Sequence, residues 1–176
     1  MPFIETPIQD LVIFEPKVFG DHRGYFFESY NERTFHEAGI TSTFVQDNQA
    51  ASSYGVLRGM HLQKGSKAQA KLVRVLSGEV YDVTVDMRPD SPTYLQSYGI
   101  TLSGENHKQL FVPRGFIHGY LVTSEHAVFA YKCDNLYAPE AEQGYRYDDP
   151  AFGIEWPEID GEYTVAERDL AWPLLT

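Results

Sequence analysis

The stretch Gly55-Val-Leu-Arg-Gly-Met-His61-Leu-Gln63 decides how the remainder of the chain is interpreted. It places Arg58 and His61 three positions apart in an otherwise apolar run. Burying such polar groups costs free energy unless they are paired or used in chemistry. We therefore expect other parts of the chain to supply partners for Arg58 and His61.

The overall composition indicates a single globular domain covering residues 1–176. Hydrophobic residues make up 43% of the chain and aromatic residues 14%, which is enough for a sizeable core. The formal net charge of -11 argues against nucleic-acid binding, because that function needs a broad basic face. The charge still allows a small anionic ligand that is held by a few local arginines.

The sequence also predicts a soluble, cytoplasmic protein without a membrane partner. No apolar run approaches the roughly 20 residues that a membrane-spanning helix needs. The N-terminal residues lack the basic and apolar regions of a signal peptide. Cys133 is the only cysteine, which excludes an internal disulfide and is typical of a reducing compartment.

Short strand-like segments separated by Gly and Pro turns dominate the chain. The segments Lys71–Leu76 and Glu79–Asp86 flank the turn Ser77-Gly78, which predicts a hairpin. Many short strands at close spacing indicate an all-β sandwich or barrel. Further strands are predicted at Leu11–Phe14, Tyr25–Tyr30, Phe44–Asn48, Tyr94–Leu102, Gln109–Val112, Phe116–Val122 and Ala127–Cys133.

Helical structure is expected at few places. The segment Asn31–Ala38 predicts a helix, with Asn31 as its N-cap and Gly39 as its C-terminal stop. The tail from Tyr145 onward is richer in Asp, Glu and Pro. We expect this tail to be irregular, with short helical turns, and to wrap around the core.

Two motifs resemble those of the cupin superfamily, but their metal ligands are incomplete. Pro113-Arg-Gly-Phe-Ile-His118 resembles the second cupin motif, and the spacing from Gly55 to His61 resembles the start of the first. The first motif normally continues with a second histidine and then a glutamate, whereas this chain has Gln63 and Lys67-Ala68. Metal sites generally use three or four N, O or S ligands, and a nearby lysine repels a divalent ion. We therefore expect no bound metal.

Four residues have the chemistry for acid–base catalysis without a metal. His61 titrates in the range of a general base, and Lys71 begins a predicted strand close behind it. Tyr131 lies on a later strand, and Asp169 is available to orient a histidine. Each residue alone has a commoner structural explanation, such as core hydrogen bonding, packing or solvation. Only their combination favours catalysis.

Four cations are candidates for anion binding, namely Arg23, Arg58, Lys71 and Arg168. If the fold brought them together, they would hold a phosphate or diphosphate through charge-assisted hydrogen bonds. The alternative is that each pairs with one of the 25 acidic residues. The sequence alone leaves both interpretations open.

From about residue 4 to residue 175 the sequence resembles the dTDP-4-dehydrorhamnose 3,5-epimerase family, whose members epimerise a nucleotide-linked keto sugar without a cofactor. The matching pieces are specific when taken together, although each is weak alone. They include Asp21-His-Arg-Gly24, Phe44-Val-Gln-Asp-Asn48, the Gly55–His61 stretch, Lys71-Leu-Val-Arg74, Pro113-Arg-Gly-Phe-Ile-His-Gly119, Tyr137-Ala-Pro-Glu140 and Ile154-Glu-Trp-Pro157.

This resemblance implies a jelly-roll, or double-stranded β-helix, fold with a few short helices. It also implies a homodimer in which an N-terminal strand is contributed to the partner. By the same resemblance, His61 is the general base, Asp169 its partner, Tyr131 the general acid and Lys71 the residue near the keto oxygen. The implied substrate contacts are Arg23, Glu28, Gln46, Asp47, Asn48, Arg58, Lys71, His118, Glu142 and Arg168.

The implied reaction inverts carbons 3 and 5 of dTDP-4-keto-6-deoxy-D-glucose, in dTDP-L-rhamnose biosynthesis for cell-envelope polysaccharide. The ketone acidifies the C–H bonds on both flanking carbons, so that proton removal gives an enolate and reprotonation on the other face inverts the centre. No redox cofactor is needed, which agrees with the absence of a Gly-x-Gly-x-x-Gly motif.

Three alternatives stay open at this point. One is a single-centre epimerase or ketoisomerase that acts on another nucleotide-linked keto sugar. The others are a non-catalytic sugar-binding cupin and a metal-dependent cupin enzyme.

Several positions depart from the family pattern, although none removes the catalytic set. Leu62 stands where the family usually has phenylalanine, Phe111 where tryptophan is common, and Leu136 where an aromatic residue is frequent. Arg114 replaces a common glutamate, and Arg168 a common lysine. These departures leave the substrate preference and the nucleotide base open.

Overall fold

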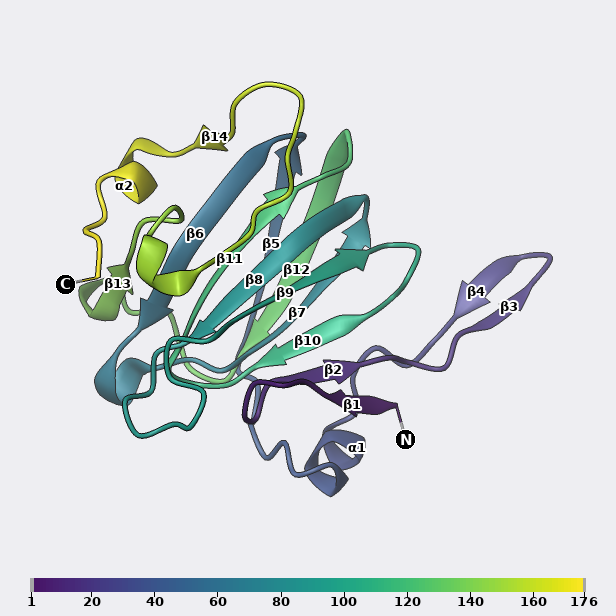
Figure 1. The fold of residues 1–176 in the computed structure, drawn as a ribbon. Coiled ribbons are helices and arrows are strands. Elements are labelled where there is room, and N and C mark those ends of the chain that lie inside the picture. Colours follow the sequence, from purple (N-terminus) through teal and green to yellow (C-terminus); the bar gives the residue numbers. More distant parts are fainter. Residues whose placement is uncertain (1, 176) are drawn as a thin grey trace.

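The computed structural model describes residues 2–175 and consists mainly of two β-sheets that face each other (Figure 1). The first sheet contains, in spatial order, β1 (Phe3–Glu5), β2 (Val12–Phe14), β10 (Gln109–Val112), β7 (Lys71–Ser77), β12 (His126–Cys133) and β5 (Gln46–Ser53). The second sheet contains β13 (Glu142–Gly144), β6 (Val56–Gln63), β11 (Phe116–Val122), β8 (Glu79–Asp86) and β9 (Ser97–Ser103), with β14 (Thr164–Val165) beside β6.

The remaining elements are short. Strands β3 (Phe19–Asp21) and β4 (Gly24–Phe26) form a separate hairpin that projects away from the body of the molecule (Figure 1). The helices are α1 (Glu32–Glu37), η1 (Gly65–Lys67), η2 (Pro139–Ala141), η3 (Pro150–Phe152) and α2 (Glu167–Leu170). None of the helices within residues 2–175 has the length and the apolar composition that crossing a membrane requires.

From β5 to β12 the chain passes back and forth between the two sheets, and only β8 and β9 follow each other within one sheet. This alternation confirms the predicted jelly-roll architecture. The predicted hairpin between residues 71–76 and 79–86 was wrong, because β7 pairs with β10 and β12 whereas β8 pairs with β9 and β11. The turn at Ser77-Gly78 is a corner between the sheets. Gly78 fits there because its φ is 78° and a Cβ would clash with the carbonyl oxygen of His126.

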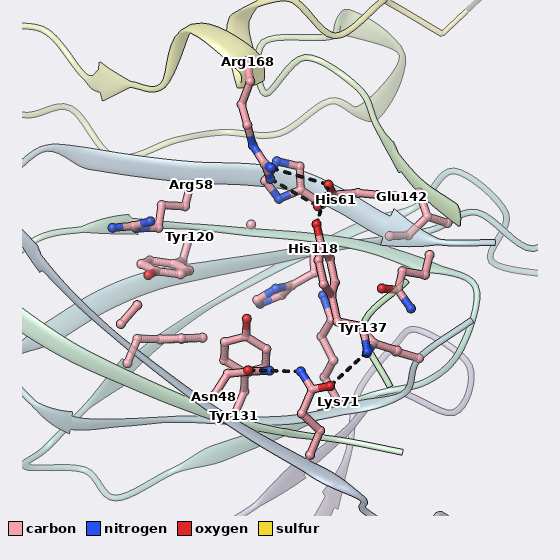
Figure 2. Close-up of a pocket in the computed structure, with 17 residues that line it drawn as sticks. Asn48, Arg58, His61, Lys71, His118, Tyr120, Tyr131, Tyr137, Glu142 and Arg168 are labelled. Carbon is pink, nitrogen blue, oxygen red and sulfur yellow. Dashed lines mark hydrogen bonds and ion pairs between the residues drawn. The ribbon is translucent and has the colours of Figure 1, made fainter. Parts of the chain in front are cut away.

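Apolar side chains fill three regions, and these explain why so many strand residues are buried. One cluster lies between the sheets and includes Val73 and Val80. Helix α1 packs Phe35 against the outer face of the first sheet, and the C-terminal segment packs Phe152 against the outer face of the second. The inner faces of the sheets also carry the polar side chains that line a cavity (Figure 2).

Local sequence signals located the helix well and the strand ends less well. In α1, Asn31 is the N-cap and accepts a hydrogen bond from the N–H of Thr34 at 3.3 Å, and Gly39 follows with a φ of 86°. The strand predicted at residues 25–30 ends at Phe26, and the strand predicted at residues 44–48 continues to Ser53. The tail is irregular with short helical turns, as expected.

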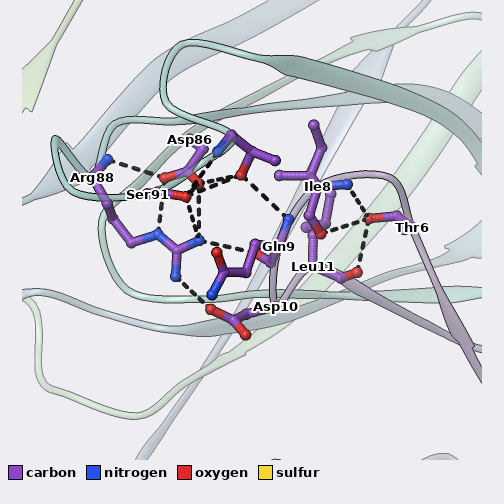
Figure 3. Close-up of polar contacts among 9 residues, drawn as sticks. Thr6, Ile8, Gln9, Asp10, Leu11, Asp86, Arg88 and Ser91 are labelled. Carbon is purple, nitrogen blue, oxygen red and sulfur yellow. Dashed lines mark hydrogen bonds and ion pairs between the residues drawn. The ribbon is translucent and has the colours of Figure 1, made fainter.

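An ionic network centred on the buried carboxylate of Asp86 ties the turn before β2 to the loop after β8 (Figure 3). The carboxylate of Asp86 is fully buried and accepts hydrogen bonds from Arg88 at 2.8 and 2.9 Å. It also accepts the hydroxyl protons of Ser91 at 2.6 Å and Thr93 at 2.7 Å. Arg88 extends the network to Asp10, at 2.7 Å. Burial alone would raise the pKa of Asp86, but these hydrogen bonds outweigh it and lower the pKa to about 2.

Replacing Arg88 with alanine should lower the free energy of unfolding by about 3 kcal/mol at neutral pH, because the buried Asp86 carboxylate loses its cation. The contribution of Asp86 is fully present above the ordinary aspartate pKa of 3.8 and is lost as the pH falls through about 2. The difference between the two proteins should therefore shrink over this range, as measured by urea unfolding.

The matched control is Arg33→Ala at an exposed position of α1, which should change the stability by less than about 0.5 kcal/mol. A loss below about 1 kcal/mol for Arg88→Ala at neutral pH would show that the network does not hold the turn in place.

Candidate active site

A cavity of about 410 Å³ lies between the inner faces of the two sheets (Figure 2). Strands β5, β7 and β12 contribute to it from the first sheet, and β6 and β11 from the second. The connection between β12 and β13 and the helix α2 complete its mouth. The lining residues are Gln46, Asn48, Ala50, Arg58, His61, Leu62, Gln63, Gln69, Lys71, His118, Gly119, Tyr120, Phe129, Tyr131, Tyr137, Glu142 and Arg168.

His61 on β6 is paired with Asp169 on α2. The distance from His61 Nε2 to Asp169 Oδ1 is 2.8 Å, and the other carboxylate oxygen accepts the N–H of Gly59 at 3.3 Å. Gly59 is required here, because its φ is 129° and a Cβ would lie 2.6 Å from the Cα of Gly119. The pairing of β6 with β11 shifts register at this point.

The charge state of Asp169 suits an orienting partner for a histidine base. Burial would raise the pKa of Asp169, but the hydrogen bonds from His61 and from the backbone of Gly59 lower it below the ordinary value. The carboxylate is therefore ionised at neutral pH. An ionised carboxylate fixes the orientation of the imidazole and stabilises the imidazolium that forms when the ring takes a proton.

Tyr131 and Lys71 line the cavity from the first sheet, opposite β6. Lys71 Nζ lies 5.9 Å from the centroid of the Tyr131 ring. Burial raises the pKa of Tyr131 to about 12, so that its hydroxyl is protonated at neutral pH and is able to donate. Burial also lowers the pKa of Lys71. The cavity thus has His61 on the second sheet, paired with Asp169 of α2, and faces it with two hydrogen-bond donors, Tyr131 and Lys71, on the first sheet.

A second histidine–carboxylate pair lies deeper between the sheets. His118 Nε2 is 2.8 Å from Asp82 Oδ2, and both side chains are buried. The ring of His118 is stacked near that of Phe129, with the centroids 6.0 Å apart. The other oxygen of the Asp82 carboxylate is buried without a hydrogen-bond partner among residues 2–175.

Glu142 lies at the mouth of the cavity, where it contacts Arg168 and Tyr137. Arg168 binds Glu142 at 3.2 Å and Asp169 at 3.3 Å. The hydroxyl of Tyr137 donates to Glu142 at 3.3 Å. Glu142 therefore bridges the loop after β12 and helix α2.

Arg58 and Lys71 are the cations of the cavity that make no ion pair within residues 2–175. Arg58 donates instead to the hydroxyl of Ser52 at 3.0 Å. Two unpaired cations in a chain with a net charge of -11 are the feature expected of a site for an anionic ligand.

Three residues predicted as substrate contacts lie outside the cavity of their own chain. Arg23 stands on the projecting β3–β4 hairpin, pairs with Asp21, and has a side chain that is 78% exposed. Glu28 is exposed in the segment after β4. Asp47 points to the outer face of the first sheet, where it binds Lys132 at 3.0 Å. Its neighbours on β5 line the cavity, because successive residues of a strand face opposite sides.

Sequence reasoning did not select several residues that the structure places in or beside the cavity. Tyr120 was within reach of the strand pattern, since it stands two positions after His118 on β11. Asp82 also lies on a predicted strand, β8. Its hydrogen-bond partner, His118, lies on β11, and the sequence does not show that these two strands pair. Tyr137 had no local signal, because its position depends on an irregular loop, whereas Gln63 lies on β6 and was noted only as the residue that replaces a metal-ligating histidine.

The fold and the cavity together define the class of protein. It is a cupin-like jelly roll whose interior carries paired histidines and carboxylates facing a tyrosine and a lysine. Residues 5–176 match the family dTDP-4-dehydrorhamnose 3,5-epimerase. The chain belongs to this family, and it is an isomerase of the kind that epimerises carbohydrates.

Individual relatives agree with this assignment. The dTDP-4-dehydrorhamnose 3,5-epimerase of Salmonella typhimurium is 52% identical, over 99% of this chain and 96% of its own length. The dTDP-6-deoxy-D-glucose-3,5-epimerase of Legionella pneumophila, solved with dTDP-4-keto-L-rhamnose, has a TM-score of 0.94 and 48% identity, covering 98% and 91% of the two chains. A 3'-monoepimerase of Streptomyces bikiniensis, solved with dTDP-quinovose, has a TM-score of 0.89 and 30% identity, covering 96% and 85%.

Replacing Asp169 with asparagine should lower the epimerisation rate on the order of 10³-fold, because the amide no longer stabilises the imidazolium of His61. Steady-state rates together with circular dichroism of the folded protein measure this effect. Glu167→Gln removes an exposed carboxylate from the same helix and is the control, for which we expect an unchanged rate. A loss of less than about tenfold in Asp169→Asn would contradict the orienting role.

Proposed function

We propose that this chain inverts carbons 3 and 5 of dTDP-4-keto-6-deoxy-D-glucose to give dTDP-4-keto-L-rhamnose. The observation that carries the proposal is the placement of His61 across the cavity from Tyr131 and Lys71 (Figure 2). Asp169 holds His61 from behind, at 2.8 Å. Inversion requires two opposed groups, since a single group would return the proton to the face from which it came. The ligand in the Legionella structure supports this choice of substrate.

Each group has a distinct role in the proposed mechanism. His61 removes the proton next to the ketone, and Asp169 stabilises the imidazolium. Tyr131, whose pKa is about 12, delivers a proton from the other face. Lys71 donates to the enolate oxygen, and a single donor of this kind is worth about 2.7–4 kcal/mol in the transition state.

The anionic part of the substrate is proposed to bind where the cavity has cations. Arg58 is free to bind a diphosphate, and Arg168 stands at the mouth. Amide side chains of Gln46 and Asn48 and the ring of His118 complete the proposed substrate contacts, with Glu142 at the edge. Holding the diphosphate positions the sugar between base and acid, which is a large part of the catalytic effect.

A second candidate function is epimerisation at a single carbon, because a 3'-monoepimerase shares the fold at 30% identity. Of the positions that depart from the family pattern, Leu62 lines the cavity, and Leu136 is exposed and precedes Tyr137, which lines it. Phe111 has no direct bearing on the substrate, since it packs in the cluster under α1. Proton exchange at one carbon or at both separates the two functions.

We also propose a homodimer in which the β3–β4 hairpin of each chain packs on the other. The hairpin exposes Phe19 at 55%, Tyr25 at 60% and Phe26 at 70%. A two-stranded hairpin that displays so much apolar surface gains stability when a partner covers it. In such a dimer Arg23, with Glu28 behind it, would reach the partner's cavity and add a cation for the diphosphate. A cytoplasmic location belongs to the same proposal and is supported by the buried free thiol of Cys133.

The dimer is tested by mixing two inactive or weakened variants, Arg23→Ala and His61→Ala, under conditions of subunit exchange. If Arg23 serves the partner's cavity, each mixed dimer has one cavity with both wild-type residues, so activity should rise above the sum of the separate variants. Activity that stays at the sum would mean that Arg23 acts in its own chain or not at all. Sedimentation of the wild-type chain at monomer mass would contradict the dimer itself.

The reaction is tested by proton NMR of the substrate with the protein in deuterated water. We expect deuterium at carbons 3 and 5 with the wild-type protein and none with His61→Ala. Tyr131→Phe should still exchange protons through His61 but should fail to invert at least one carbon. Exchange at one carbon in the wild type would instead establish the single-centre function.

Suitable controls for this experiment are His126→Ala and Tyr94→Phe, both at exposed positions, which should exchange at the wild-type rate. Normal exchange by His61→Ala would remove His61 from the role of base. Complete double inversion by Tyr131→Phe would remove Tyr131 from the role of acid.

A further inference from the structure

Gln63, at the end of β6, binds the backbone of residues 135–138 instead of pointing its polar atoms into the cavity. Its Nε2 donates to the carbonyl oxygens of Leu136 at 3.2 Å and Lys67 at 2.7 Å. Its Oε1 accepts the N–H of Ala138 at 2.9 Å. Both polar atoms of this 6% exposed side chain are therefore used by the backbone. This is the position at which the metal-binding motif would have its second histidine.

Two other glutamines hold the same segment from different elements. Gln46, at the start of β5, accepts the N–H of Tyr137 at 2.9 Å through Oε1. Gln69, just before β7, donates from Nε2 to the carbonyl oxygen of Asn135 at 2.7 Å. We call residues 135–138 the mouth segment and the side chains of Gln46, Gln63 and Gln69 the amide clamp. The clamp binds each of the four residues of the mouth segment through one backbone group.

The mouth segment needs such a clamp because it is an irregular connection between β12 and η2, and its contribution to regular structure is the Ala138 carbonyl oxygen, which accepts the N–H of Ala141 at 3.0 Å. Its backbone is fixed, yet the side chains of Leu136 and Tyr137 are 62% and 54% exposed. Tyr137 lines the cavity and is further fixed through its hydroxyl, which donates to Glu142 at 3.3 Å. A surface whose backbone is held in place before a ligand arrives loses little conformational entropy on binding.

The position of the chemistry decides which part of the substrate meets this surface. The reacting sugar must lie beside His61 and Tyr131, in the interior between the sheets. The non-reacting nucleotide end of the substrate then extends to the mouth. We infer that Gln46, Gln63 and Gln69 are positioning residues that keep the mouth segment in one conformation and thereby set the affinity for the nucleotide without acting on proton transfer. This inference rests on the proposed function.

The test compares Gln63→Met with the wild-type protein, because methionine keeps the length of the side chain and removes its three hydrogen bonds. The dissociation constant of dTDP, measured by calorimetry, should rise about tenfold, as should KM. The exchange rate at saturating substrate should stay within about twofold of wild type. Amide hydrogen exchange of residues 135–138 should become faster, while the thermal unfolding temperature shows whether the fold is intact.

Two further variants keep the outcome clear. Gln69→Met loses one hydrogen bond to the mouth segment and should weaken dTDP binding less than Gln63→Met does. Gln96→Met, at an exposed position in the loop before β9, is the matched control and should bind as the wild type does. Unchanged dTDP affinity in Gln63→Met, or a fall in kcat without a change in affinity, overturns the inference.

Failure of the clamp and failure of the proposed function give different results. A wild-type protein that binds dTDP but exchanges no protons in the keto sugar would refute the proposed reaction. The clamp would then be tested by the dissociation constants of dTDP for Gln63→Met and Gln69→Met. A wild-type protein that binds no dTDP would overturn both.

Discussion

The hydrogen bond between His61 and Asp169 is the interaction on which the remainder of the structure depends. It joins residues that are 108 positions apart in the chain. A histidine inside a β-sandwich needs a partner, and the ionised carboxylate supplies one only if α2 is docked against β6. The C-terminal segment secures that docking by packing on the outer face of the second sheet and by pairing β14 with β6. The tail is thus part of the catalytic arrangement and also part of the core.

The jelly roll gives the two sides of the cavity different chemical properties. Because the chain alternates between sheets, β6 and β7 follow each other in sequence but place His61 and Lys71 on opposite walls. Burial between the sheets raises the pKa of Tyr131 and lowers that of Lys71, and these shifts have no counterpart at a solvent-exposed surface. The scaffold therefore provides opposed groups with tuned acidities, which is what inversion of a carbon next to a ketone requires.

Local patterns predicted those features that depend on local physics. The N-cap and C-terminal glycine of α1, the strands β8, β10 and β11, and the irregular tail all follow from capping, alternation and turn chemistry. The predicted β7–β8 hairpin was wrong because a two-residue turn does not say whether the next strand stays in the sheet or crosses to the opposite one. The alternation of side chains along a strand gave a reason to doubt the predicted substrate contact of Asp47. Its neighbours Gln46 and Asn48 face the cavity, so Asp47 faces the opposite side of the sheet.

The sequence by itself determined the class of fold, the presence of a base, an acid and several cations, and a family resemblance that names their roles. It determined these because strand periodicity and side-chain chemistry are properties of the residues themselves. The Asp169–His61 contact was implied by the resemblance and is present in the structure, whereas only the tertiary structure decided that Asp82 meets His118 and that three glutamines hold residues 135–138. These contacts join segments that are far apart in the chain, and their geometry is set by how the two sheets and the tail pack together, which no local pattern encodes.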